Sequence, residues 1–543
     1  MPKFHRWWVL PLLAAAAWGA EPRLILVVSV DQMRHDYLTR LASVYQGGFK
    51  TLLERGAVFT QAMYRHSNNE TGPGHSVILS GRHGSSSGIV TNSWWDPYLN
   101  RPVNVVDDPV HRPVGGPGRG ASPANFIGFT VGDKIKQKWP QSRVVGVSMK
   151  DRSAILMTGH RADAAYWFEN ECGCFVTSTY YTPRPPGWLV EFNGRKLPDR
   201  YFQKPFNPWN RLLPDAALYE KYAGMDAFFG EWDLKDIVFP HLHRGRPGEA
   251  DYYEYLRRTP YADELVLEAA LEILRSHDLG TDEAPDVLAV GFSGADVVGH
   301  TYGPDSHEQM DELLRLDLVM EKLFQAAEAR AGRAGLLVIL TSDHGVMPLV
   351  ERLQKEGKDA RRVKPTTLEE AVGAALKKHY PGTPGLVVDF DVPNFTLGLE
   401  AIQKHGLKRA DVEQNLISAL LATGGVAHVY THSETLSDKP SSDPYLPLFQ
   451  NSFYQPRTPH LMVLPKKYHY VDSRVGGTGH GTPYEYDRHV PMVWMGAGIR
   501  PGRHSAAAGP EDIAPTLAKM LGIEYPLERD ARLLHELLTQ PRP

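Results

Sequence analysis

Short apolar runs recur along the chain, and each is followed by a polar or charged cluster. The runs cover residues 23–30, 143–149, 286–291 and 336–340. Continuous apolar runs of this length are typical of strands that are buried on both faces of a sheet. Between them lie segments whose apolar residues have helical spacing, such as 307–331. This alternation predicts an α/β fold: a doubly wound, mainly parallel sheet with helices on both faces.

Charged residues follow the ends of all four predicted strands. They are Asp31, Lys150, Asp296 and Asp343. A single Asp after a strand is usually a helix cap or a turn residue. In doubly wound sheets, however, ligands bind outside the carboxyl ends of the strands. Repetition of this pattern, with His residues nearby, therefore predicts a functional site at that edge of the sheet.

Three segments depart from the alternation and are predicted to be insertions into one catalytic domain that spans 21–543. Residues from about 98 to 125 are rich in Pro, Gly and Asn, which indicates a long loop. Residues 178–262 combine Pro with many aromatic side chains, and we expect a cap beside the site. Residues 349–465 indicate a small α+β insert. Its predicted elements are helices near 367–379 and 408–422 and extended runs at 386–391 and 426–431.

The N-terminus has the composition of an export signal. Lys3 and Arg6 precede an apolar stretch over 7–17, and small residues follow up to Ala20. The stretch is short for a permanent membrane span, and an uncleaved anchor is the alternative interpretation. We therefore expect residues 1–20 to be a signal peptide, and the mature protein to be periplasmic or secreted without a permanent membrane anchor.

Overall charge and cysteine content exclude some functions. The formal net charge is −4 over 543 residues, with no long basic or acidic run. This balance argues against nucleic acid as an obligate partner. The two cysteines, Cys172 and Cys174, are separated by one glycine. They are expected to form either a local disulfide or two inert thiols, because a metal site needs more ligands. No sequence pattern indicates the oligomeric state.

Asp and His residues at the strand ends and in one Gly-rich segment supply candidate metal ligands. They are Asp31, Asp296, His300, Asp343, His344 and His480. Mixed oxygen and nitrogen donors suit zinc or a related divalent ion. Each motif alone is weak, because an Asp-His pair also suits a turn and Asp-x-x-x-His arises by chance. Glycines around His480 let the backbone come close to a bound group.

Thr71 is the candidate nucleophile. It lies in Asn68-Asn-Glu-Thr-Gly-Pro-Gly-His-Ser76, and Pro73 suits the first turn of a helix. Thr71 is thus expected at or just before a helix N-terminus, where free N–H groups favour an anion such as phosphate. The alternative is an ordinary threonine cap. A hydroxyl coordinated to a divalent metal loses its proton without a general base, and two metals roughly 4 Å apart can stabilise both the attacking and the leaving oxygen.

The order of these motifs resembles that of the threonine-type bacterial alkaline phosphatases with a Lys-x-Arg pair, within the alkaline phosphatase superfamily. The motifs are Thr71-Gly-Pro-Gly-His-Ser76, Asn92-Ser-Trp-Trp95, Lys150-Asp-Arg152, Asp296-x-x-x-His300, Asp343-His344, Gly479-His480-Gly481 and Asp512-Ile-Ala-Pro-Thr516. The similarity covers nearly the whole chain after the signal. It implies a two-zinc hydrolase of small phosphate monoesters that forms a covalent phosphothreonine at Thr71.

The resemblance also implies individual residue roles. One zinc would be surrounded by Asp31, Thr71, Asp343 and His344, and the other by Asp296, His300 and His480. The non-bridging phosphoryl oxygens would be contacted by Asn92, Lys150 and Arg152. Manganese or cobalt could occupy similar ligands.

Lys150 and Arg152 favour a monoester over a diester. A guanidinium and an ammonium can satisfy two or more charged oxygens, and a diester replaces one of these with a bulky group. The first alternative is a phosphodiesterase or nucleotide pyrophosphatase of the same superfamily; for these, Lys150 and Arg152 would be a solvated turn. The second alternative is a non-catalytic phosphate- or metal-binding protein, which predicts lost ligands or a lost hydroxyl. Neither loss is observed in the sequence.

Overall fold

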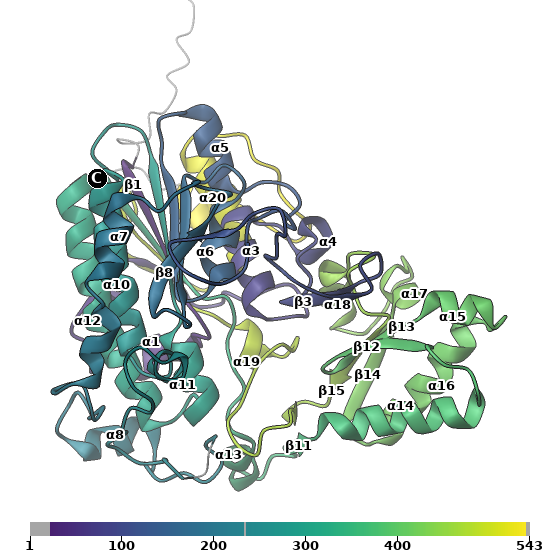
Figure 1. Cartoon of the computed structure of the whole chain (residues 1–543). Coiled ribbons are helices and arrows are strands. Elements are labelled where there is room, and N and C mark those ends of the chain that lie inside the picture. The colour runs from purple at the N-terminus through teal and green to yellow at the C-terminus, as the bar shows by residue number, and fades with distance from the viewer. Residues whose placement is uncertain (1–21, 233–234, 539–543) are drawn as a thin grey trace, which may run out of the picture.

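A ten-stranded sheet forms the centre of the larger part of the molecule (Figure 1). The computed structural model describes residues 22–232 and 235–538. In spatial order the strands are β18 (Gly502–His504), β2 (Ala57–Phe59), β17 (Met492–Gly496), β10 (Leu336–Thr341), β1 (Leu24–Val30), β9 (Asp286–Phe292), β6 (Val144–Ser148), β7 (Ala164–Glu169), β8 (Cys174–Ser178) and β5 (Pro113–Val114). The central strands β10, β1, β9, β6 and β7 are parallel, and β17 and β8 are antiparallel to their inner neighbours. The predicted fold class is confirmed.

The four apolar runs form the central strands because helices cover both faces of the sheet. Every residue of β1 is buried. Its alternate side chains enter two different cores: Leu24 and Leu26 pack with α10 (Tyr261–Ser276) and α12 (His307–Ala331), whereas Ile25 and Val27 pack with α3 (Thr71–Ser80) and α20 (Ile513–Met520). Apolar residues at every position are therefore required, which explains the absence of a polar alternation in the sequence.

Further helices of the larger part connect the strands. They are α1 (Asp36–Arg40), α2 (Gly48–Arg55), α4 (Gly84–Ser87), α5 (Val131–Lys138), α6 (Asp151–Thr158), α7 (Gly187–Gly194), α8 (Ala216–Ala223), α9 (Ala250–Leu256), α11 (Gly294–Tyr302), α13 (Val350–Lys355), α19 (Glu485–Arg488) and α21 (His535–Leu538), with 3₁₀ turns at Leu197–Phe202 and Pro510–Asp512. Among these, α11 directly follows β9 and α6 directly follows β6.

Most of segment 349–465 forms a smaller lobe beside the main sheet, drawn in green in Figure 1. Its four strands have the order β12 (Val387–Asp391), β13 (Asn394–Leu397), β15 (Leu461–Pro465) and β14 (Val426–Thr431). Its helices are α14 (Pro365–His379), α15 (Leu399–Lys404), α16 (Arg409–Ala422), α17 (His432–Thr435) and α18 (Leu446–Ser452). The lobe has a hydrophobic cluster of its own, and β11 (Arg361–Val363) pairs with β16 (His469–Val471) where the chain enters and leaves it.

The other two expected insertions differ in detail from the sequence prediction. Residues 98–125 contain two short strands where we predicted only a loop. One is β4 (Arg101–Asn104), which pairs with β3 (Ser93–Asp96), and the other is β5, which pairs with the distant β8. Several aromatic side chains of segment 178–262 belong to the core: Tyr201, Trp209 and Tyr219 are fully buried beside α10 and α12.

Two predictions concern the cysteines and the N-terminus. Cys172 and Cys174 are joined by a disulfide next to the start of β8. The expected signal peptide, 1–20, lies outside the described residues. Within the described part of the chain, no helix combines the length and apolarity needed to cross a membrane.

Candidate active site

Neighbouring strands bring the predicted acidic residues to one edge of the sheet. Asp31 directly follows β1, Asp343 follows β10, and Asp296 lies in the first turn of α11, after β9. Because β1 pairs with both β9 and β10 in parallel, these three carboxylates meet at the carboxyl ends of adjacent strands. Lys150 follows β6, the next strand beyond β9.

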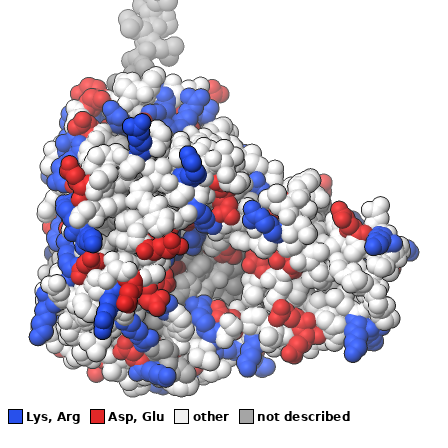
Figure 2. Space-filling model, viewed as in Figure 1, with Lys and Arg blue, Asp and Glu red and all other residues white. Residues whose placement is uncertain are grey.

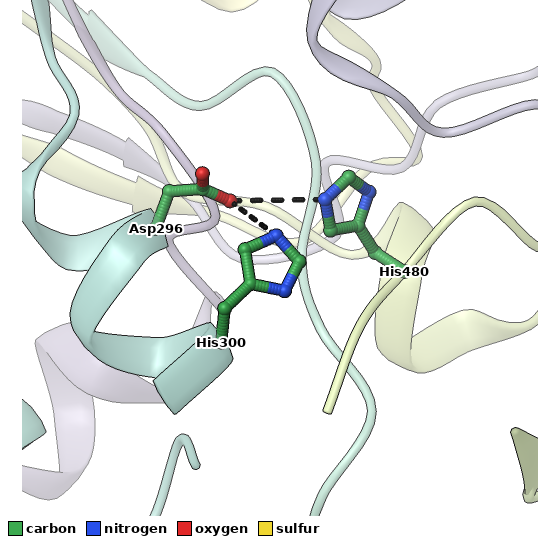
Figure 3. Close-up of side chains that lie close together, drawn as sticks. All are labelled: Asp296, His300 and His480. Carbon is green, nitrogen blue, oxygen red and sulfur yellow. Dashed lines mark ion pairs between the residues drawn. The ribbon is translucent and has the colours of Figure 1, made fainter. Parts of the chain in front are cut away.

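One candidate metal set consists of Asp296, His300 and His480 (Figure 3). Their ligand atoms lie within 4.8 Å of one another. Nε2 of His300 lies 3.2 Å from Oδ1 of Asp296, one helical turn away on α11, and Nε2 of His480 lies 3.7 Å from the same oxygen. His480 comes from the Gly-rich loop between β16 and α19. The structure thus brings these three predicted ligands together.

The second candidate set contains a histidine that the sequence interpretation did not select. Asp31, His75 and Asp343 have ligand atoms within 4.8 Å of one another. Nε2 of His75 lies 3.1 Å from Oδ1 of Asp31. The predicted ligand His344 is next to this set, with Nε2 3.1 Å from Oδ2 of Asp343. His75 lies one turn after Thr71, and this i, i+4 spacing is the signal that could have identified it.

All four histidines have the same orientation. Each places Nδ1 at hydrogen-bond distance from a main-chain carbonyl oxygen and Nε2 near an aspartate. The carbonyl partners are Thr71 for His75 (2.9 Å), Thr478 for His300 (2.7 Å), Gly345 for His344 (3.0 Å) and Asn69 for His480 (2.7 Å). Metal-binding histidines characteristically donate the second ring N–H in this way, because the bond fixes the ring and frees the other nitrogen.

Lys150 links the two sets electrostatically. Its buried Nζ lies 2.9 Å from Oδ2 of Asp31 and 2.6 Å from Oδ2 of Asp296. Burial opposes ionisation of both carboxyls, but Lys150 and nearby imidazoles outweigh it and hold the pKa of Asp31 and of Asp296 well below the usual range. Burial and two neighbouring imidazoles keep the pKa of His480 well below its usual value. Ionised carboxylates and a neutral imidazole are the forms that bind metals.

Unpaired buried atoms show that this donor set fits a divalent cation. Within the described chain, Oδ1 of Asp31, Oδ2 of Asp343 and Nε2 of His344 are buried and make no hydrogen bond, although each lies at ion-pair distance from another member of the cluster. A buried polar atom without a partner costs roughly 1–3 kcal/mol, so native proteins seldom leave one unsatisfied. Ligation would satisfy these atoms, and carboxylate oxygens with imidazole nitrogens match the preferences of zinc.

Gln32 also connects the two sets, and sequence reasoning missed it. Its main-chain N–H donates to Oδ1 of Asp343 (3.0 Å), and its Nε2 donates to Oδ1 of Asp296 (2.8 Å). Gln32 is fully buried and has a φ of 64°, in the left-handed region that a non-glycine residue occupies at a cost of about 1–3 kcal/mol. No local sequence signal marks this conformation.

The N-terminus of α3 presents Thr71. Thr71 is buried and is the first residue of the helix, while Glu70 is the N-cap, so the structure does not support the alternative of a threonine cap. Oδ1 of Asn92 accepts from the N–H of Gly72 (2.7 Å), and Oε2 of Glu70 accepts from the N–H of Asn92 (2.8 Å). These two bonds fix Asn92 beside Thr71.

Lys150 and Arg152 flank the start of α6, which packs against α3. Arg152 is partly exposed, and its buried Nε makes no hydrogen bond within the described chain. Asp151 pairs with Arg119 at 2.6 Å and with Nη1 of Arg152 at 3.7 Å. Burial raises the pKa of Glu70, and the charge of Arg152 is close enough to act against this effect. Of the predicted phosphate contacts, Lys150 and Arg152 thus come from the N-terminal end of α6, and Asn92, which precedes β3, is held at the N-terminus of α3.

Replacement of Gly74 by alanine tests how closely α3 must approach the strand ends. A Cβ at Gly74 would lie 2.2 Å from the carbonyl oxygen of Asp343. The helix would have to move, and a displacement of about 1 Å at a reacting group can cost roughly 100-fold in rate. We expect Gly74→Ala to lower kcat/KM for an aryl phosphate by about that factor, as measured on purified protein.

Gly373→Ala is the matched control. Gly373 lies within α14 of the smaller lobe, and no atom lies within 4 Å of its added Cβ. Alanine is favoured over glycine in a helix by about 1 kcal/mol, so this variant should be as stable as the wild type or more stable, with unchanged activity. Wild-type rates in Gly74→Ala would show that the close contact does not position Thr71.

Comparison with known proteins identifies the family. The model of the type I phosphodiesterase / nucleotide pyrophosphatase family matches residues 25–485. The chain belongs to this family. Among its curated relatives, alkaline phosphatase PhoV of Synechococcus elongatus is 30% identical, over 96% of this chain and 93% of the relative. Alkaline phosphatase PafA of Elizabethkingia meningoseptica is also 30% identical, over 96% of each chain.

A solved structure extends the comparison to three dimensions. The crystal structure of wild-type alkaline phosphatase PafA superposes with a TM-score of 0.88 at 30% identity, and it covers 95% of this chain and 99% of that one. The resemblance to alkaline phosphatases inferred from the ordered motifs is confirmed by these matches. Within the family, this chain therefore groups with proteins named alkaline phosphatases.

Proposed function

We propose that this chain is a phosphate monoester hydrolase of the alkaline phosphatase type, with Thr71 as nucleophile and two zinc ions as cofactors. The common orientation of the four histidines is the observation that carries the proposal. In each imidazole, Nδ1 lies at hydrogen-bond distance from a main-chain carbonyl oxygen, and Nε2 points to a carboxylate beside the N-terminus of α3. Three of these histidines are the proposed ligands, and in them the Nδ1 hydrogen bond fixes the ring while Nε2 stays free to bind a metal.

The proposed ligands are the first set and a second group in which His344 takes the place of His75. Asp296, His300 and His480 would hold one zinc, and Asp31, Asp343 and His344 would hold the other together with the Thr71 hydroxyl. When bound, the metals supply positive charge that favours the Thr71 alkoxide and stabilises the leaving oxygen. His75 lies between the carboxylates of Asp31 and Asp343 and keeps them apart at fixed distances.

The chain's own residues account for the rest of the reaction. The Thr71 hydroxyl gives up its proton to solvent, and its oxygen forms a bond to phosphorus while the ester P–O bond breaks. The leaving oxygen keeps the bonding electrons and takes a proton from solvent. A water molecule then attacks the phosphothreonine, releases inorganic phosphate and regenerates the Thr71 hydroxyl. Because Oδ1 of Asn92 is engaged by the N–H of Gly72, its Nδ2 remains available to donate to a phosphoryl oxygen.

Arg152→Ala tests the preference for monoesters. A charge-assisted hydrogen bond contributes about 1.5–3 kcal/mol, so loss of the guanidinium should lower kcat/KM for 4-nitrophenyl phosphate by roughly 10- to 150-fold. The rate with bis(4-nitrophenyl) phosphate should change little, because a diester offers one charged oxygen fewer. The ratio of the two rates is the measurement.

Arg361→Ala provides the matched control for the loss of one guanidinium. The side chain of Arg361 is 66% exposed and pairs with the similarly exposed Asp359, so both rates should stay at wild-type values. A wild-type enzyme that prefers the diester would contradict the proposed function, and an unchanged ratio in Arg152→Ala would remove the proposed role of Arg152.

We also propose that residues 1–20 direct export to the periplasm or the medium. The basic, apolar and small-residue segments at the N-terminus support this. The Cys172–Cys174 disulfide gives independent support, because disulfides persist in oxidising compartments.

A further inference from the structure

A cleft separates the smaller lobe from the main sheet and reaches the candidate active site. Its empty space, which is open to solvent, is about 940 Å³. Figure 2 shows the molecular surface hollowed between the two parts of the chain. Glu70 and His480 line the cleft, and they are respectively the residue before Thr71 and a candidate metal ligand. The cleft is therefore continuous with the position where an ester bond to phosphorus would break.

The two walls of the cleft come from different parts of the chain. The smaller lobe contributes apolar side chains, among them Val392, Phe449 and Met462. The segment that returns from the lobe to the main sheet contributes Tyr470 and Tyr486. Pockets for small organic groups are typically lined in this way, with apolar and aromatic side chains and a few polar groups at one end.

Charged residues of the cleft have one sign. Its lining includes the carboxyl groups of Glu70 and Asp487, and burial raises the pKa of both, that of Asp487 to about 7. No described residue of the lining is Lys or Arg. Asp391 adds a third carboxyl next to Val392, and burial together with the Glu70 carboxylate raises the pKa of Asp391 to about 7. The nearby cation Arg474 is neutralised by Asp472, at 2.8 Å. Among the described lining residues, an anionic leaving group would therefore have no Lys or Arg side chain to pair with.

We propose that this cleft receives the leaving group of the ester and selects an uncharged or cationic apolar group over an anionic one. The proposal rests on the proposed phosphatase function and names its substrate class. An aryl ring can pack on the tyrosine and phenylalanine faces, and an attached ammonium gains from both the aromatic faces and the carboxylates. A leaving group that carries a second phosphate is disfavoured, which separates this chain from a nucleotide pyrophosphatase.

Three aryl phosphates of one series test the selection. The phenyl ring carries 4-trimethylammonio, no substituent or 4-sulfonato, and kcat/KM is corrected for the acidity of each phenol. We expect the trimethylammonio ester to react about tenfold faster than the sulfonato ester, because charged clefts concentrate substrates of opposite sign. The difference should shrink in about 0.5 M salt, where the Debye length falls below roughly 5 Å.

Substitution at the cleft mouth tests the role of the lining directly. Val392 is 43% exposed and lines the cleft, so a charge there does not disrupt a core. Val392→Lys should raise kcat/KM for the sulfonato ester and lower it for the trimethylammonio ester, by about threefold each, and Val392→Glu should have the opposite effect. Leu421→Lys is the matched control, since Leu421 is 42% exposed and lies on α16 of the same lobe. It should leave all three rates unchanged.

The outcomes separate the two proposals. Hydrolysis of none of the three esters would contradict the phosphatase function itself. Hydrolysis of all three at rates set only by phenol acidity, with no change in their ratios on Val392→Lys or Val392→Glu, would overturn the cleft proposal and leave the phosphatase function intact. Opposite shifts for the two variants, absent in Leu421→Lys, would support it.

Discussion

Thr71→Ala is expected to lower the turnover of phosphate monoesters by about 10⁴-fold or more while the bound metal stays at the wild-type level. Loss of a nucleophile removes the covalent route entirely, and comparable losses in other hydrolases are of this size. The helix should persist, because alanine is a good helix former and no side-chain cap bond is made at the start of α3. Turnover of 4-nitrophenyl phosphate and metal content by mass spectrometry are the two measurements.

Thr71→Ser is the matched control for this prediction. Serine keeps the hydroxyl and loses only a methyl group, so its turnover should remain within roughly tenfold of the wild type. If Thr71→Ala keeps its metal and also retains turnover close to that of Thr71→Ser, Thr71 is not the nucleophile.

Removal of the metals with a chelator is expected to lower activity by about 10³-fold or more and to reduce the thermal unfolding midpoint. The carboxylates of Asp31, Asp296 and Asp343 are buried at adjoining strand ends. Without bound cations their mutual repulsion opposes folding, and a metal that binds only the folded state stabilises it by mass action. The measurements are residual activity and the unfolding midpoint before and after dialysis.

Restoration of the chelated protein identifies the ion. Zinc should restore both properties, and manganese or cobalt should restore part of the activity, because they accept similar ligands. Calcium is the control, since it requires six or more oxygen ligands and the sets contain imidazole. Activity indifferent to both the chelator and zinc would contradict metal catalysis.

The central sheet could be predicted from sequence because its strands are buried on both faces, so that they consist of continuous runs of apolar residues. The boundaries of β1, β6, β9 and β10 lie within one or two residues of the apolar runs. The acidic residues at the strand ends could also be located, because parallel strands place their carboxyl ends at one edge. The apolar runs did not indicate the order of the strands, in which β1 lies between β9 and β10.

Features that depend on distant partners could not be predicted. Gln32 takes a left-handed conformation because Asp343 and Asp296, far along the chain, accept its hydrogen bonds. The strand β5 forms because β8 offers a free edge, and Pro and Gly around it conceal the pairing.

The smaller lobe leaves the main sheet soon after His344 and returns just before His480, and the rings of these two histidines stack at 3.5 Å. The lobe is thus an insertion in the chain, and the segments before and after it contact each other at the candidate active site. The lobe can change in sequence and shape during evolution without moving the reacting groups, because the stacked rings of His344 and His480 fix the chain on either side of it. Changes in this lobe are therefore one way in which members of the family can come to differ in substrate preference.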